Sequence, residues 1–217
     1  MHDAHRRATS MLADALDRAT RPDVVADLRD FVVAMLVHHH RCEDDDLWPL
    51  LEAADPNLAP ALDALSEEHG SLDAALERLG AAPVAGLADT AAQRAVAAVR
   101  VLVHEHLDHE EPILLPALRA HVSDRAWAEF SARTVASAPQ EGAHLFVGLL
   151  HEVGAPDDVE LIVRHLPPDA QAAVPAMRDQ ARSTFVALRT APPAAGRRHR
   201  PGRQGSNASS SPMELHR

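Results

Sequence analysis

The sequence predicts an all-α protein, in which an up-down-up-down four-helix bundle is followed by a smaller C-terminal helical region and a disordered tail. Ala and Leu dominate the 217 residues, of which 46% are hydrophobic and only 3% aromatic. That composition favours helix. Apolar residues also recur at helical spacing through most of the first 120 residues. Helices joined by short connections predict a bundle of antiparallel neighbours.

The apolar stripes place the bundle helices at residues 4–19, 22–53, 58–79 and 88–120. Pro22 stands where proline starts a helix, and Pro49 is expected to kink the second helix near its end. Asp55-Pro56-Asn57 reads as a break. Gly80 is expected to cap the third helix, and residues 81–87 to form a loop.

Residues 121–190 are predicted to form an appended helical region. Ser123 can cap a helix that runs to about Ala138. Further helices are expected around residues 145–150, 157–165 and 168–189. Residues 191–217 are rich in Pro, Gly, Ser and Arg, which is typical of a disordered tail. The predicted division is therefore a bundle over 1–120, a helical region over 121–190 and a tail over 191–217.

Two short stretches of the predicted bundle repeat each other. His39 precedes Glu43 by four residues, and His106 precedes Glu110 by four. Each pair therefore shares one helix face, and in both helices that face is the apolar one. A buried carboxylate is costly without a positive partner, and no Lys or Arg lies on these stripes. A metal ion is the simplest partner, and a plain His–Glu ion pair inside the bundle is the alternative.

Each of these pairs is preceded by a helix with a core histidine. His69 interrupts a stripe of leucines in the third helix, and His5 lies on the first, with His2 as its alternative one turn earlier. At about 1.5 Å per residue, antiparallel packing brings these histidines to a similar level. The chain thus reads as a duplicated helical hairpin.

The resulting set holds too many ligands for one tetrahedral zinc ion, and it suits two octahedral ions with both carboxylates bridging them. Nitrogen and oxygen ligands with open positions indicate iron or manganese, with water, peroxide or dioxygen in the open positions. The set comprises His5, His39, Glu43, His69, His106 and Glu110. The neighbouring His38 and His40 are expected to face outward or to support the ligands. Glu111 and the run from Asp44 to Asp46 are expected to be solvated.

Composition also limits the setting of the protein. A formal charge of −11 argues against nucleic-acid binding by the main body. No apolar run approaches the roughly 20 residues of a membrane span, and no apolar signal core opens the chain. The single cysteine, Cys42, excludes an intramolecular disulfide and suits a reducing cytosol, so we expect a cytoplasmic protein. No protein partner is indicated.

Over residues 1 to about 120 the sequence resembles the hemerythrin-like (HHE cation-binding) family. The resemblance is carried by His5, His39-x-x-x-Glu43 leading into Trp48-Pro49, Glu68-His69, and His106-x-x-x-Glu110 leading into Leu115-Pro116. It implies a four-helix bundle with a non-haem centre of two iron ions. It also implies a small ligand, which would be dioxygen, peroxide or nitric oxide.

Two departures from the oxygen-carrying members bear on the activity. Asp73 stands where those carriers have a second histidine one turn after the third-helix histidine, and Glu110 follows His106 by four residues instead of five. These departures favour redox turnover, such as catalase-like disproportionation of peroxide during oxidative stress, over reversible oxygen carriage. Asp73 is either a seventh ligand or a solvated residue. The alternatives are a module that binds or senses oxygen, nitric oxide or iron without turnover, and a structural protein with a vestigial site.

Overall fold

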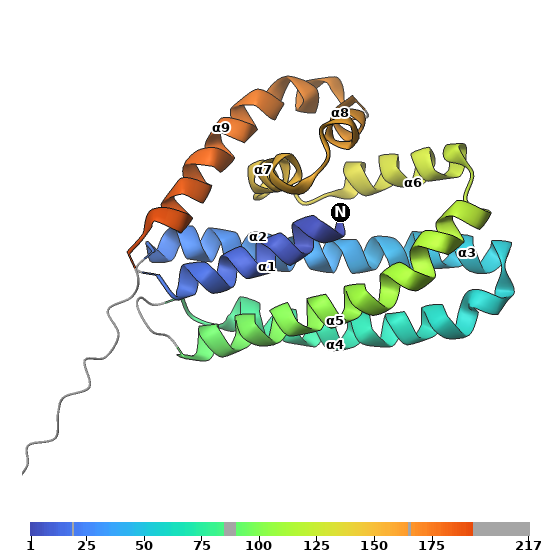
Figure 1. Cartoon of the computed structure of the whole chain (residues 1–217), viewed down its shortest axis with the longest axis horizontal. Helices are drawn as coiled ribbons and strands as arrows, with labels where there is room; N and C mark the ends of the chain where they lie inside the picture. Colours follow the sequence, from blue (N-terminus) through green and yellow to red (C-terminus); the bar gives the residue numbers. More distant parts are fainter. Residues whose placement is uncertain (19, 85–89, 165, 193–217) are drawn as a thin grey trace, which may run out of the picture.

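The computed structural model describes residues 1–18, 20–84, 90–164 and 166–192, and every element in them is helical (Figure 1). The all-α prediction is thus confirmed for these residues. The predicted tail lies outside the described residues from 193 onward. The elements are α1 (His2–Leu16), α2 (Pro22–Cys42), η1 (Glu43–Leu47), α3 (Trp48–Ala54), η2 (Pro56–Leu58), α4 (Ala59–Ala81), α5 (Thr90–His121), α6 (Asp124–Ser137), α7 (Ala143–Val153), α8 (Pro156–Arg164) and α9 (Pro168–Thr190).

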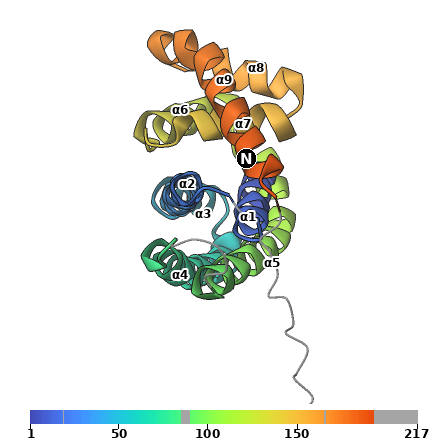
Figure 2. The same ribbon diagram turned by 90° about the vertical axis from the view of Figure 1, so that its left-hand side faces the viewer.

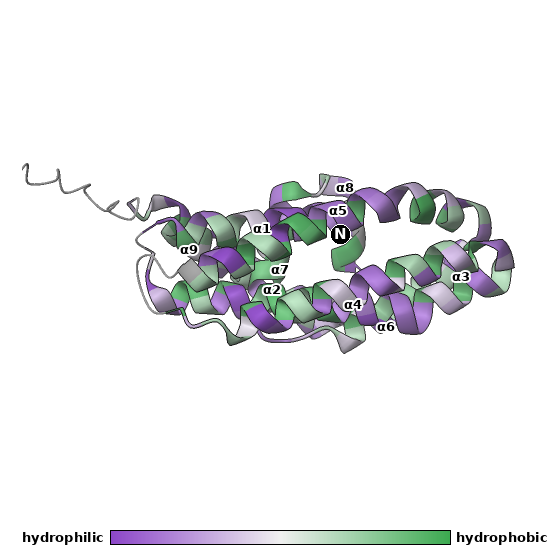
Figure 3. Ribbon diagram, turned by 90° about the horizontal axis from the view of Figure 1, so that it is seen from below, coloured by the Kyte–Doolittle hydropathy of each residue, from purple (hydrophilic) through white to green (hydrophobic). Residues whose placement is uncertain are grey.

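The N-terminal part is built from long helices around a shared interior. Helix α1 contacts α2 and α5, and α4 contacts the same two helices (Figure 2). Amphipathic stripes explain this packing. The leucines at 62, 65, 72, 76 and 79 of α4 are all at most 2% exposed, whereas hydrophilic residues alternate with them along the helix (Figure 3).

The interior consists of two apolar clusters with a polar layer between them. One cluster joins α1, α2, α4 and α5 with parts of α7 and α9, and it includes Leu36, Leu72 and Leu107. The other lies toward the α3 end and includes Leu51, Leu65 and Leu114. Buried histidine and glutamate side chains come from the helix segments between these clusters. The fold therefore surrounds its polar groups with hydrocarbon on two sides.

The predicted second helix, 22–53, is not continuous. It changes at Glu43 into a π-helical segment, η1, and resumes as α3 at Trp48, whose backbone N–H donates to the Glu43 carbonyl. Pro49 has no N–H to donate to the residue one turn before it, which removes one bond of the regular helix. The irregularity thus precedes the proline and begins at a predicted ligand, as single-turn π-bulges often do at functional sites.

The expected cap at Gly80 is also wrong. Helix α4 continues through Gly80 and ends at Ala81, and Ala82 is the C-cap in an extended conformation. Gly80 does not adopt the positive φ of a glycine cap, which among the described glycines occurs only at Gly142. Because Ala82 leaves the helix through the extended region, the helix end requires no left-handed residue.

The C-terminal helices α6 to α9 lie on the α1–α2 side of the bundle, away from α4 (Figures 1 and 2). Ser123 caps α6 as expected, since its Oγ accepts from the N–H of Ala126 at 3.2 Å. Gly142 is the N-cap of α7 and has a φ of 76°. A Cβ atom at this position would lie only 2.7 Å from the Phe31 ring, so the close approach also favours glycine. Arg7 of α1 is bonded to Glu152 of α7 at 2.6 Å. No helix within the described ranges is long and apolar enough to cross a membrane.

Candidate metal centre

The polar layer brings together side chains from the four long helices and η1. His39 comes from the end of α2, Glu43 from the start of η1 and His69 from the middle of α4. His106 and Glu110 lie one turn apart on α5. Apart from His39, which retains slight exposure, these side chains are at most 4% exposed. The structure thus collects at one level five of the residues that the sequence analysis singled out.

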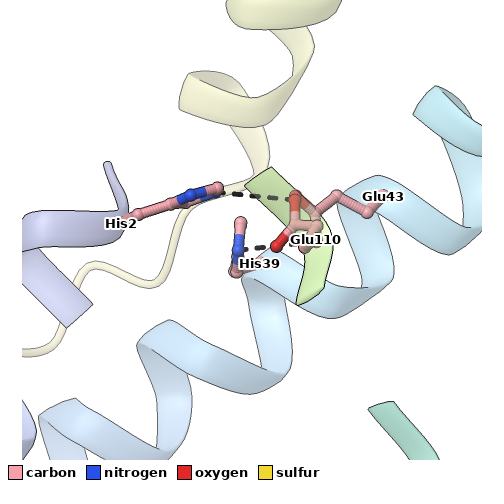
Figure 4. Close-up of side chains that lie close together, drawn as sticks. All are labelled: His2, His39, Glu43 and Glu110. Atoms are coloured by element: carbon pink, nitrogen blue, oxygen red, sulfur yellow. Dashed lines mark ion pairs between the residues drawn. The ribbon is translucent and has the colours of Figure 1, made fainter. Parts of the chain in front are cut away.

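Each buried carboxylate faces two imidazoles from opposite sides of the bundle. Oε2 of Glu43 lies 3.4 Å from Nε2 of His39 and 3.6 Å from Nε2 of His69. Oε2 of Glu110 lies 3.3 Å from Nε2 of His106, and its Oε1 lies 3.6 Å from Nε2 of His2. Ligand atoms of His2, His39, Glu43 and Glu110 all lie within 4.8 Å of one another (Figure 4). The two glutamates therefore stand between two groups of histidines.

His2 joins this compact group, and His5 lies beside it. Nδ1 of His2 is 3.0 Å from Oε1 of Glu111, which directs its Nε2 toward Glu110. His5 is fully buried, its ring centroid is 4.3 Å from that of His39, and both of its ring nitrogens lack a hydrogen-bond partner. Both first-helix histidines are thus at the centre, and His2 has the closer approach to a carboxylate.

Outer carboxylates fix the orientation of the other rings. Nδ1 of His69 lies 2.9 Å from Asp44, and Nδ1 of His106 lies 2.9 Å from Glu68. An ionised carboxylate only accepts, so in the neutral rings these nitrogens carry the proton and each Nε2 presents a lone pair. The two Nε2 atoms lie 3.2 Å apart. Two lone pairs facing each other in a buried site require a proton or a cation between or beside them.

Asp44 and Glu111 are expected to be solvated, and they are only partly so, at 35% and 32% exposure, because both also form specific bonds. Asp44 also accepts from Ser66 Oγ at 2.7 Å, and Glu111 is bonded to Arg6 at 2.6 Å as well as to His2. Each sits next to a predicted ligand in the sequence, where the helix turns it toward a ring on the neighbouring helix. Sequence spacing alone did not show which neighbour each would meet.

His40 takes the second of its two expected roles, which is to support a ligand. It is 2% exposed, not turned outward, and its ring stacks on that of His69 with centroids 4.4 Å apart. Its Nδ1 lies 2.7 Å from Oδ1 of Asp73, which is 44% exposed. Asp73 is thus neither isolated in solvent nor among the inner carboxylates; it holds His40. The sequence feature that could have indicated this pair is the presence of a second histidine, His40, beside His39, together with an aspartate, Asp73, one turn after His69.

The electrostatics of the inner carboxylates would favour a bound cation. Burial, together with the nearby charge of Glu110, raises the pKa of Glu43 well above its usual value. Burial also opposes ionisation of Glu110, but His106 and His2 outweigh it and lower the pKa of that carboxyl. Oε2 of Glu43 and both oxygens of Glu110 have no hydrogen-bond partner. Buried oxygens without partners are costly.

The imidazoles are held mostly in the neutral form that binds metals. Burial, aided by His2, lowers the pKa of His5 well below its usual value, and burial with His5 does the same for His39. Burial lowers the pKa of His69 to about 4. His106 differs, because Glu110 and Glu68 outweigh burial and raise its pKa. A proton on His106 satisfies part of the site when no cation is present.

The spacing of these groups fits cation binding better than hydrogen bonding. The carboxylate-to-Nε2 separations of 3.3–3.6 Å are long for N–H···O bonds, which cluster near about 2.9 Å. Metal–ligand bonds of about 2.0–2.2 Å place neighbouring ligands on one ion roughly 3.0–3.5 Å apart. The donor set of imidazoles and carboxylates suits iron, manganese or zinc.

Comparison with known proteins agrees with this chemistry. The family model described as hemerythrin HHE cation-binding domain matches residues 1–118, which include α1, α2, α4, most of α5 and every inner group of the site. Neither a search of curated proteins nor a search of solved structures found a match to the chain.

Proposed function

The chain belongs to the hemerythrin HHE cation-binding domain family, and from this premise we propose that it is a non-haem di-iron protein whose main role is the handling of peroxide. In this proposal residues 1–120 form an up-down-up-down bundle, and His5, His39, Glu43, His69, His106 and Glu110 hold the ions. His2 and His40 extend that set, and Asp73 acts through His40. Manganese is the alternative metal.

The observation that carries the proposal is the position of the two inner glutamates. Glu43 faces His39 and His69, and Glu110 faces His2 and His106. Each carboxylate therefore meets one ring from the α1–α2 side and one from the α4–α5 side. A pair of carboxylates shared in this way suits two cations, and it does not suit one tetrahedral ion.

The iron pair, when bound, would supply the redox chemistry that passes two electrons and two protons from one hydrogen peroxide molecule, which becomes dioxygen, to a second, which becomes two water molecules. The protein's own groups hold the rings and limit access. Asp44 and Glu68 keep the Nδ1 protons of His69 and His106 in place, so that Nε2 of each ring stays directed inward. The apolar clusters on either side exclude water from the carboxylates.

Oxygen release from peroxide tests this function. Iron-loaded protein is expected to release dioxygen faster than the same concentration of free iron, and Glu110→Gln is expected to abolish the excess. Asp108→Asn, at a 71% exposed carboxylate on the same helix, is the matched control and should retain activity. Iron content is measured for each sample. A stable ligand-dependent optical band without dioxygen release would instead support a binding or sensing module, and it would refute turnover.

A further inference from the structure

The C-terminal helices enclose a cavity of about 310 Å³ between themselves and the α1–α2 side of the bundle. Its walls are mainly apolar, and the buried side chains of Phe31 and Met35 on α2 and of Val147 and Leu150 on α7 take part in them. Small-molecule sites typically occupy about 300–1,000 Å³. An engineered apolar cavity of about 150 Å³ stays dry and binds benzene. This cavity therefore has room for a larger apolar molecule.

One end of the cavity lies against the metal centre. His5 and His39 are among its lining residues. His5 is completely buried, and neither of its ring nitrogens has a hydrogen-bond partner. A neutral imidazole can donate one hydrogen bond and accept another. The cavity thus combines an apolar body with a polar inner end whose bonding capacity is unused.

The other polar lining groups offer little to a charged ligand. No arginine side chain is among the described lining residues, and the sequence contains no lysine. Nε2 of His38 already lies 3.0 Å from Ser137 Oγ, and Nδ1 of His151 donates to the Val147 carbonyl at 2.9 Å. A carboxylate or phosphate moved into such walls would lose its hydration without gaining a side-chain counter-charge.

We propose that this cavity binds a neutral, mainly hydrocarbon molecule whose single hydroxyl or carbonyl group faces His5 and His39. The cavity shares His5 and His39 with the metal centre, and each ring has a second nitrogen beside the one that would hold an ion. Its apolar walls need no metal to form. It also gives the C-terminal helices a role, because α6 to α9 and the segments that connect them supply most of its lining.

Displacement of a neutral fluorescent probe tests the site. N-phenyl-1-naphthylamine added to the full-length, metal-free protein is expected to brighten with one site per chain, and 1-octanol is expected to displace it. Ala170→Phe fills the cavity from α9 and should weaken probe binding at least about tenfold. Ala172→Phe changes an exposed residue of the same helix and should leave binding unchanged. Ala34→Leu fills the cavity from the α2 wall and should weaken binding as well.

Three results would overturn the inference. One is absence of probe binding, and another is equal binding by Ala170→Phe, Ala34→Leu and the Ala172→Phe control, with folding of each variant verified by circular dichroism. The third is displacement by octanoate as effective as that by 1-octanol, which would contradict the neutral ligand class.

Histidine-ring NMR of the unsubstituted protein locates the polar end without relying on any variant. Adding 1-octanol is expected to shift the ring signals of His5 and His39. The signal of His121, which pairs with Asp55 at the far end of α5, is expected to stay in place. Unchanged His5 and His39 signals with probe displacement intact would refute the proposed orientation.

Discussion

Replacing Glu43 by glutamine is expected to change the stability of the protein in opposite directions with and without metal. In the metal-free protein Glu43 is buried, and its ligand oxygen lies within 4.8 Å of that of Glu110. Two charges at that distance repel by about 3 kcal/mol at an effective dielectric constant of about 20. Glu43→Gln removes this repulsion, so metal-free protein should gain up to about 3 kcal/mol of unfolding free energy at pH 8.

The sign of the pH dependence follows from the raised pKa of Glu43. A carboxyl whose pKa is higher in the folded state binds its proton more tightly there, so stability is lost as pH rises from its unfolded value toward its folded one. The gain from Glu43→Gln should therefore be largest at pH 8 and disappear near pH 4.5. With iron bound, the same substitution removes an anionic ligand and should weaken metal binding at least about 100-fold.

Urea unfolding at several pH values and metal titration measure these effects. Asp45→Asn, at an exposed position of the same π-helical segment, is the matched control and should change stability by no more than about 0.5 kcal/mol. Lower stability of metal-free Glu43→Gln than of the parent protein at pH 8 would refute the proposed repulsion. Unchanged metal affinity of this variant would refute the role of Glu43 as a ligand.

Further substitutions test the support of the site and the packing of the C-terminal helices. Glu68→Ala removes the acceptor of the His106 Nδ1 proton and should lower iron affinity by about 10–100-fold in a competition titration; unchanged affinity would contradict the orienting role. The lowered pKa of His69, about 4, means that the unfolded chain takes up a proton there between about pH 6.5 and 4 while the folded chain does not. In metal-free protein His69 should thus contribute a loss of about 3 kcal/mol as the pH falls over that range, in addition to the losses from His5 and His39, and His69→Gln should make the total loss in urea unfolding smaller by about that amount. Gly148→Ala would place its Cβ 2.4 Å from that of Ala181 and should lower the melting temperature. Gly70→Ala, which has open space around it, should stabilise the protein by about 0.5–1 kcal/mol. Equal shifts in the two variants would argue against close α7–α9 packing.

The positions of the helices, and the position of the metal centre along them, could be predicted from the sequence because both depend on the local spacing of residues. Four-residue spacing placed Glu43 beside His39 and Glu110 beside His106, and the structure gives both pairs, at 3.4 and 3.3 Å. Side chains one turn apart share a helix face whatever surrounds them. Ser123 was recognised as a cap for the same reason, since its bond reaches only three residues along the chain.

Contacts between helices were not readable in this way. Whether Asp44 meets His69, or Asp73 meets His40, depends on how α2, η1 and α4 are rotated against each other, and one sequence does not encode that rotation locally. The π-helical segment that begins at Glu43 adds such a rotation within a predicted continuous helix.

The sequence by itself determined that the chain is helical and that imidazole and carboxylate groups occupy the apolar faces of its first helices. Only the tertiary structure decided that His2 approaches Glu110 more closely than His5 does, and that the C-terminal helices close a cavity over His5 and His39. The physical reason is that a side chain's position along and around a helix follows from residue spacing, whereas its partners on other helices follow from packing between elements far apart in the chain.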